Sequence, residues 1–173
     1  HYDFAPRDKQ REVFEKQIAI AVERNLPIVV HTRESTEESI ETVERFCVKH
    51  PHWRNNGSGE VKGARGVFHC FTGTADQARK LFALGFHVSF PGIVTFKNSP
   101  VLETLKSIGH ESILLETDSP FLTPSPFRGK RNEPAYIPYI ANKIAEVLNT
   151  TPGVVAGQTT ANAKRLFSLD SNA

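Results

Sequence analysis

The stretch Ile113-Leu114-Leu115-Glu116-Thr117-Asp118-Ser119-Pro120 decides the fold class of this chain. Three consecutive apolar residues predict a short strand that is buried on both faces, and the Ser-Pro pair ends it. A glutamate and an aspartate follow the apolar run, so two carboxylates stand at the carboxyl end of the strand. Parallel α/β proteins place their functional groups at this end. The stretch therefore predicts an α/β fold with a functional site at one edge of its sheet.

Two further stretches repeat this design, namely Pro27-Ile28-Val29-Val30-His31 and Gly66-Val67-Phe68-His69. Each is a short apolar run that ends on a histidine. Because the carboxyl ends of parallel strands meet at one edge of a sheet, we expect His31, His69 and Asp118 to converge. Imidazole and carboxylate groups bind divalent ions such as zinc, manganese or iron. The pattern predicts a metal site, although a hydrogen-bonded core histidine is the alternative for each histidine alone.

Helical periodicity, N-cap residues and terminating glycines separate these strands from one another. We expect Thr74 and Thr151 to cap helices, and residues 50–65 to form a surface loop. The expected strands are 28–31, 66–70, 86–90 and 112–117, and the expected helices are 7–24, 36–49, 74–84, 99–108, 136–148 and 152–167. This alternation predicts parallel strands with helices outside them.

Four such units suit either an open doubly wound sheet or part of a TIM-type (β/α)8 barrel. The sequence contains no G-x-G-x-x-G and no G-x-x-x-x-G-K-[ST], which argues against the common nucleotide-binding sheets. Candidate functional residues at three separate strand ends favour the barrel. A complete barrel takes about 250 residues, whereas this chain has 173. We therefore expect residues 1–173 to form a single partial barrel domain, the C-terminal half, with about four β/α units.

The composition suits a water-soluble chain with no strong global charge. The net charge is +2, and two cysteines are too few for a disulfide framework, which favours reduced thiols and a cytoplasmic location. No apolar run approaches the roughly 18 residues of a membrane span. The chain begins at His1 and contains no methionine, so we expect a fragment or a processed chain.

Several charged residues lie near the three strand ends. Glu116 precedes Asp118 by two residues and so shares its strand face, and Arg33 follows His31 closely. The loop that follows Asp118 carries Arg128, Lys130 and Arg131 around a glycine, a composition that suits a clamp for backbone phosphates. Surface ion pairs and a merely solvated loop are the alternatives.

These motifs together resemble those of the TatD-type metal-dependent deoxyribonucleases. The likeness is carried by the segments 29–33, 68–73, 114–120 and 128–134, in the expected order. It implies an amidohydrolase-like (β/α)8 barrel that hydrolyses phosphodiester bonds of DNA, often from the 3′ end. It also implies divalent ions (Mg²⁺, Mn²⁺ or Zn²⁺), two in a complete site.

The resemblance also implies roles for individual residues. His31, His69 and Asp118 match metal ligands, and Asp118 matches the catalytic aspartate that orients or deprotonates the attacking water. Glu116 and Arg33 match positions near the site, where we expect substrate contacts together with those of Arg128, Lys130 and Arg131.

The family's early H-x-H pair and its metal-bridging glutamate have no counterpart in this sequence. We therefore expect the likeness to cover only the C-terminal portion, completed by an N-terminal half-barrel or by self-association. Three functions stay open: hydrolysis of DNA, hydrolysis of another ester or amide, and metal-independent binding of nucleic acid or a partner by an inactive module.

Overall fold

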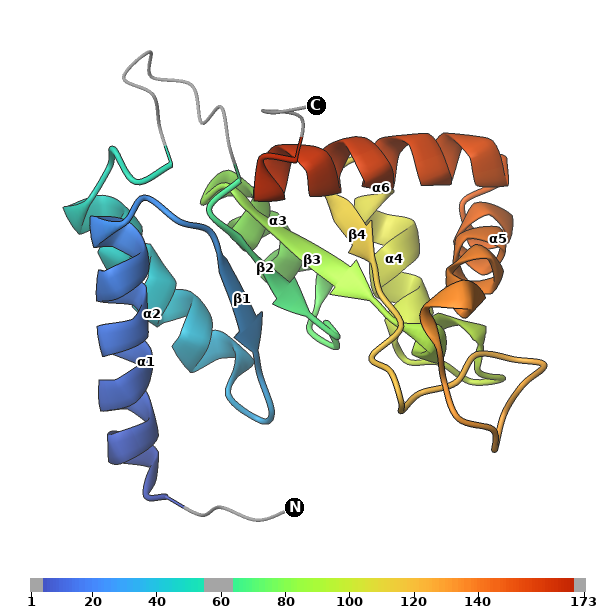
Figure 1. The fold of residues 1–173 in the computed structure, drawn as a ribbon, viewed down its shortest axis with the longest axis horizontal. Helices are drawn as coiled ribbons and strands as arrows, with labels where there is room; N and C mark the ends of the chain where they lie inside the picture. Colours follow the sequence, from blue (N-terminus) through green and yellow to red (C-terminus); the bar gives the residue numbers. More distant parts are fainter. Residues whose placement is uncertain (1–4, 55–63, 170–173) are drawn as a thin grey trace.

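A parallel sheet of four strands forms the centre of the computed structural model, which describes residues 5–54 and 64–169 (Figure 1). The strands are β1 (Ile28–His31), β2 (Gly66–His69), β3 (Phe86–Phe90) and β4 (Ile113–Leu115). All four lie where the sequence predicts them. However, β2 ends one residue earlier than expected, because Cys70 adopts a left-handed backbone conformation with φ of 50°. The strand β4 is shorter than the predicted 112–117 at both ends.

Helices precede the first strand, connect the strands and follow the last of them. They are α1 (Arg7–Glu23), α2 (Thr36–Lys49), α3 (Ala75–Ala83), α4 (Val101–Ile108), α5 (Ile137–Val147) and α6 (Pro152–Phe167), with short 3-10 turns η1 (Gly92–Thr95) and η2 (Pro134–Tyr136). Both predicted caps are confirmed: Thr74 accepts a hydrogen bond from the backbone N–H of Gln77, and Thr151 accepts one from Val154. No described helix is long and apolar enough to cross a membrane.

The strands are neighbours in chain order, β1-β2-β3-β4, and every pairing is parallel. A doubly wound sheet instead reverses its strand order at a switch point. The predicted α/β class is therefore confirmed, and the winding in one direction is the kind found in (β/α) barrels. Of the predicted surface loop, residues 55–63 lie outside the described residues.

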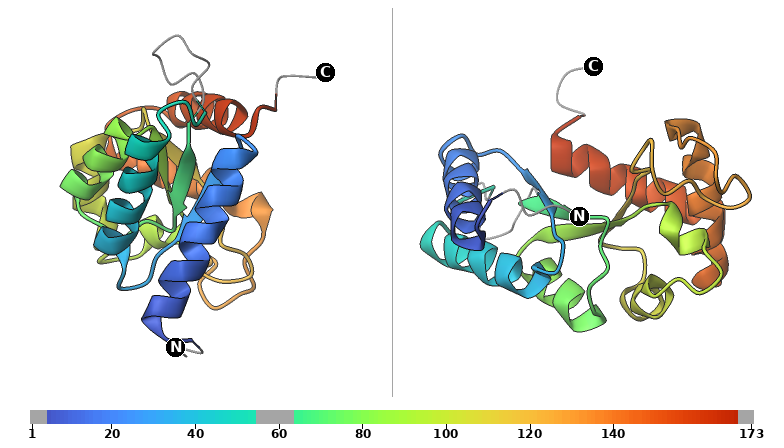
Figure 2. Two further views of the ribbon diagram at one scale, coloured as in Figure 1. Left: turned by 90° about the vertical axis from the view of Figure 1, so that its left-hand side faces the viewer. Right: turned by 90° about the horizontal axis from the view of Figure 1, so that it is seen from below.

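The two faces of the sheet are covered differently (Figure 2). On one face, Val30, Phe68, Val88 and Ile113 lie in register and are buried in the main core, against the helices on that side. Figure 2 shows α6 crossing the opposite side of the sheet from α3, where α6 covers a smaller core. The members of that smaller core are Ala64, Val67, Leu114 and Leu166.

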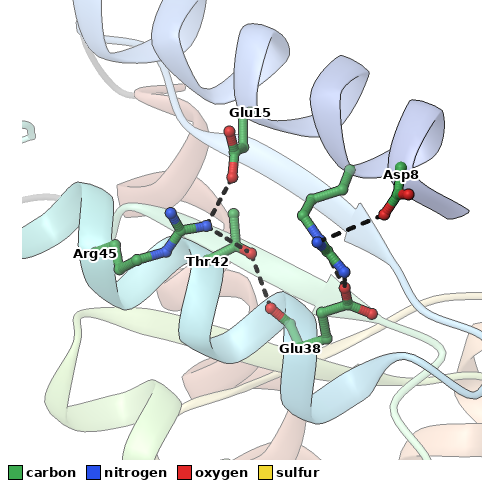
Figure 3. Close-up of polar contacts among 6 residues, drawn as sticks. Asp8, Glu15, Glu38, Thr42 and Arg45 are labelled. Atoms are coloured by element: carbon green, nitrogen blue, oxygen red, sulfur yellow. Dashed lines mark hydrogen bonds and ion pairs between the residues drawn. The ribbon is translucent and has the colours of Figure 1, made fainter.

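Polar contacts join α1 to α2 (Figure 3). Arg11 Nε donates to Glu38 at 2.7 Å, and Arg45 Nη2 donates to Glu15 at 2.7 Å. These side chains are largely exposed, so solvent and salt screen both pairs and they contribute little to stability. Ile18, which is fully buried, anchors α1 to the core, and the ion pairs orient the helix.

His87 of β3 is a buried histidine that predicts pH-dependent stability. Its Nδ1 donates to the carbonyl oxygen of Ser112 at 3.0 Å, and its Nε2 has no hydrogen-bond partner among the described residues. Burial lowers the pKa of His87 below its ordinary value of 6.5, and the positive charge of Arg165 acts in the same direction. Below pH 6.5 the unfolded chain therefore binds more protons than the folded chain, so stability is lost as the pH falls.

Urea unfolding between about pH 5 and about pH 7.5 measures this dependence. We expect the free energy of unfolding of the wild type to rise with pH across the window, and the rise to be smaller in His87→Leu. The same variant with its pH slope unchanged would show that another group carries the dependence.

Candidate active site

The ends of β1 and β2 bring two histidines into contact. His31 and His69 are direct partners in the strand register, and Nδ1 of His31 lies 2.9 Å from Nε2 of His69. The ring centroids are 4.9 Å apart. His31 is exposed and His69 is half-buried. The predicted convergence of these two histidines is therefore present in the structure.

Glu116, just beyond β4, supports His69. One of its carboxylate oxygens lies 3.2 Å from Nδ1 of His69, and the other accepts the backbone N–H of Cys70. When Nδ1–H of His69 donates to this carboxylate, the Nε2 lone pair faces His31. Carboxylates that orient a histidine in this way are common beside metal ions. The contacts give Glu116 a positioning role, and its predicted substrate contact stays a prediction.

Asp118 occupies the turn that follows β4. Its carbonyl oxygen accepts the backbone N–H of Phe121 at 2.9 Å, and its side chain is half-buried. Burial and the charges of Glu116 and Asp118 raise the pKa of the Cys70 thiol to about 11. Both carboxylates therefore lie within electrostatic range of Cys70, the residue after His69, and this thiol stays neutral at physiological pH.

The two histidines supply the nitrogen donors that a metal site uses. Nδ1 of His31 and Nε2 of His69 lie at hydrogen-bond distance, 2.9 Å, whereas two nitrogens that bind one tetrahedral zinc ion lie about 3.3 Å apart. Among the described residues, no three His, Cys, Asp or Glu side chains are placed so as to hold an ion together. The predicted three-ligand set with Asp118 stays a prediction.

A cavity of about 210 Å³ opens beside His31, between α1 and α2. Arg33 lines it together with Arg7, Arg11 and Glu38. The structure therefore places Arg33 and His31 on the same cavity, and the predicted substrate contact of Arg33 stays a prediction. The arginines outnumber the single glutamate, so the cavity favours an anionic group.

The loop after Asp118 is held by Asn132, a residue whose role the sequence motifs did not predict. Asn132 is only 2% exposed, and its Nδ2 donates to the carbonyl oxygens of Thr117 and Phe121. The loop also packs closely on η1, because a Cβ at Gly92 would clash with the carbonyl oxygen of Leu122. No local sequence pattern reveals Asn132, since its partners lie 15 and 11 residues away.

The three predicted phosphate-binding cations lie on this same loop. The guanidinium carbon of Arg128 lies 3.7 Å from the ring centre of Phe96, and Nη1 donates to the carbonyl oxygen of Thr123 at 3.0 Å. Arg128 thus contributes to the loop's own structure. Lys130 and Arg131 are exposed, and neither forms an ion pair within the described part of the chain.

Parallel strands wound in one direction, with imidazole and carboxylate groups at their carboxyl ends, define an α/β protein with the site chemistry of metal-dependent enzymes. The chain belongs to the family described as TatD related DNase, whose model matches residues 1–168. The resemblance seen in the sequence motifs is thereby confirmed.

Curated relatives extend well beyond this chain. The uncharacterized metal-dependent hydrolase YabD of Bacillus subtilis is 46% identical over 98% of this chain and 62% of its own length. YcfH of Escherichia coli, which has the same description, is 36% identical over 99% of this chain and 61% of its own length. The 3′-5′ ssDNA/RNA exonuclease TatD of Erwinia tasmaniensis is 32% identical over 96% of this chain and 62% of its own length. The chain thus spans about three fifths of these relatives.

Solved structures share the fold. The TatD homologue YJJV of Escherichia coli superposes with a TM-score of 0.79 at 23% identity, covering 96% of this chain and 61% of that one. An uncharacterized amidohydrolase of Saccharomyces cerevisiae superposes with a TM-score of 0.78 at 19% identity, covering 95% of this chain and 61% of that one. At these identities the likeness shows the fold alone.

Proposed function

We propose that this chain carries the C-terminal part of a metal-dependent hydrolase that cleaves phosphodiester bonds of DNA, from the 3′ end. The observation that carries the proposal is the pair of facing nitrogens of His31 and His69, which lie 2.9 Å apart beside Glu116. Family membership and the names of several relatives as metal-dependent hydrolases support it.

In this proposal, His31, His69 and Asp118 hold divalent ions (Mg²⁺, Mn²⁺ or Zn²⁺), two in the complete site. Such an ion lowers the pKa of water and polarises a phosphoryl oxygen. Glu116 would hold His69 in the tautomer whose Nε2 can bind a metal ion, and Asp118 would orient the attacking water and accept its proton.

In this proposal the substrate is held by cations from two parts of the chain. Arg33 binds a phosphate in the cavity beside His31, and Lys130 and Arg131 bind the DNA backbone from the loop after Asp118. Arg128 adds charge from the same loop while its guanidinium stacks on Phe96.

We also propose that the four strands are half of a (β/α)8 barrel. Among the described residues β1 pairs only with β2, and β4 only with β3, so each outer strand keeps an open edge. Val29 on β1 is 60% exposed. An N-terminal half-barrel, or a second copy of the chain, would pair these edges and supply the remaining ligands. The site would then serve a cytoplasmic enzyme that acts on DNA and does not contact the membrane.

Metal-independent binding of nucleic acid is the second candidate function. It is favoured because no three ligand side chains in the described ranges are placed to hold an ion. The same exposed cations, Lys130 and Arg131, would carry that binding.

The test of the main proposal is hydrolysis of 3′-labelled single-stranded DNA by the purified protein, with each of the three metals and with EDTA. We expect metal-dependent cleavage and no matching metal-dependent turnover of p-nitrophenyl acetate. Equal turnover of the acetate ester would instead favour hydrolysis of another ester. Bound metal is counted on the same sample.

The double variant Lys130→Gln/Arg131→Gln separates the two candidate functions. We expect it to weaken DNA binding at least about tenfold and to flatten its salt dependence. The matched control Arg24→Gln/Lys49→Gln removes the same charge near the amino ends of the strands. Retained metal-free binding without any cleavage would favour the inactive module, and unchanged binding would contradict both roles of the loop.

A further inference from the structure

We propose that Phe121 is a platform on which an unpaired nucleobase stacks beside Asp118. The proposal deepens the proposed function and rests on it in taking nucleic acid as the ligand. It names the residue that would contact the base, and stacking of this kind needs an unpaired base but does not read sequence.

The ring of Phe121 is turned out into water. Its residue is 71% exposed, compared with 44% for Phe167 and 39% for Tyr139. Single exposed apolar residues are common on protein surfaces, so exposure alone identifies nothing. Yet the other aromatic rings of this region pack together: Phe127 stacks on Tyr136 at 4.5 Å between centroids. Phe121 has no ring contact with any described residue.

The backbone beneath this exposed ring is held firmly. The N–H of Phe121 donates to the carbonyl oxygen of Asp118 at 2.9 Å, and its own carbonyl oxygen accepts from Nδ2 of the buried Asn132. The backbone N–H of Asn132 also donates to the carbonyl oxygen of Pro120 at 3.1 Å. The backbone that carries the ring is thus held three residues from Asp118, so binding need not order this part of the loop and loses less conformational entropy.

Lys130 and Arg131 lie on the returning segment of the loop, opposite the segment that contains Phe121. Thr123 donates to the carbonyl oxygen of Lys130, and Asn132 donates to Pro120, so the chain doubles back on itself. Arg131 lies between these two pairings, opposite the segment that contains Phe121. A base on the ring and a phosphate on Arg131 or Lys130 would therefore be bound by adjacent parts of one loop.

Proteins that bind single strands without sequence preference combine an aromatic ring with nearby positive charges. The ring accepts any base, because every base has a π-face. A base within a duplex has both faces covered by its neighbours. Stacking on Phe121 therefore requires an unpaired base, such as one near a frayed or single-stranded end. A protein segment as the occupant would not explain the adjacent cations.

The experiment measures binding of a single-stranded oligonucleotide that carries 2-aminopurine, with all divalent metal chelated by EDTA. We expect Phe121→Ala and Phe121→Leu each to raise Kd about tenfold and to remove the quenching of 2-aminopurine. Phe121→Trp should retain both. Phe167→Ala, which removes another exposed phenylalanine at the far end of α6, should bind like the wild type. An abasic residue at the stacking position should abolish the difference between wild type and Phe121→Ala.

Three results would overturn the proposal. If Phe121→Leu binds the oligonucleotide like the wild type, no stacking occurs. The same conclusion follows if Phe121→Ala weakens binding of the abasic strand as much as binding of the intact strand. A marked fall in Tm for Phe121→Ala without nucleic acid would show that a protein segment covers the ring. The binding assay contains no metal, so its result does not depend on hydrolysis. If binding depends on Phe121 but the protein with metal does not hydrolyse DNA, only the proposed function is refuted. Hydrolysis with unaltered binding by the Phe121 variants refutes only the platform.

Discussion

Asp118→Asn is expected to lower the rate of phosphodiester hydrolysis by about a thousandfold. An amide is neutral, so it binds a divalent ion poorly and accepts no proton from water, and general base catalysis alone is worth about a hundredfold to ten-thousandfold. Among the described residues, the Asp118 side chain makes no hydrogen bond. The substitution should therefore leave the fold intact.

The measurement is kcat on labelled single-stranded DNA, together with metal stoichiometry and Tm. Asp76→Asn is the matched control, because its carboxylate is exposed and its one ion pair among the described residues is with Arg79 of the same helix. An Asp118→Asn enzyme with activity within a few fold of the wild type would remove this residue from the catalytic machinery.

Glu116→Gln is expected to weaken metal binding by about 10- to 100-fold. Glutamine keeps one oxygen, which still accepts the N–H of Cys70, but its amide NH₂ then faces Nδ1 of His69. Nδ1 must become the acceptor, so the proton moves to Nε2, the nitrogen that faces His31. A protonated Nε2 cannot bind a metal ion. One isosteric change thus inverts the tautomer of His69.

Calorimetric titration with Zn²⁺ or Mn²⁺ tests this expectation, with Glu103→Gln on α4 as the exposed control. The Cys70 thiol gives a second, metal-free readout. Glu116 helps to raise the pKa of that thiol to about 11, so its pKa should fall in Glu116→Gln. Unchanged metal affinity with a lowered Cys70 pKa would show that the carboxylate acts on the cysteine but does not set the tautomer of His69.

The sequence alone predicted the four strands, the helices between them and the caps Thr74 and Thr151. These features depend on signals within a few residues, namely apolar runs, helical periodicity and capping side chains. It also predicted that His31 and His69 meet, because residues that end adjacent parallel strands share one edge of the sheet. The motifs around these residues were specific enough to indicate the family.

Tertiary structure decided the contacts that complete the candidate site. Asn132 holds the loop after Asp118, and Glu116 supports His69, through hydrogen bonds that span 11 to 47 residues of sequence. The sequence also does not predict the exposure of Phe121, because a phenylalanine in a loop can be either buried or exposed. Local patterns specify elements because their energetics are local. The partners of a buried amide, a carboxylate or an exposed ring are chosen only when distant segments pack together.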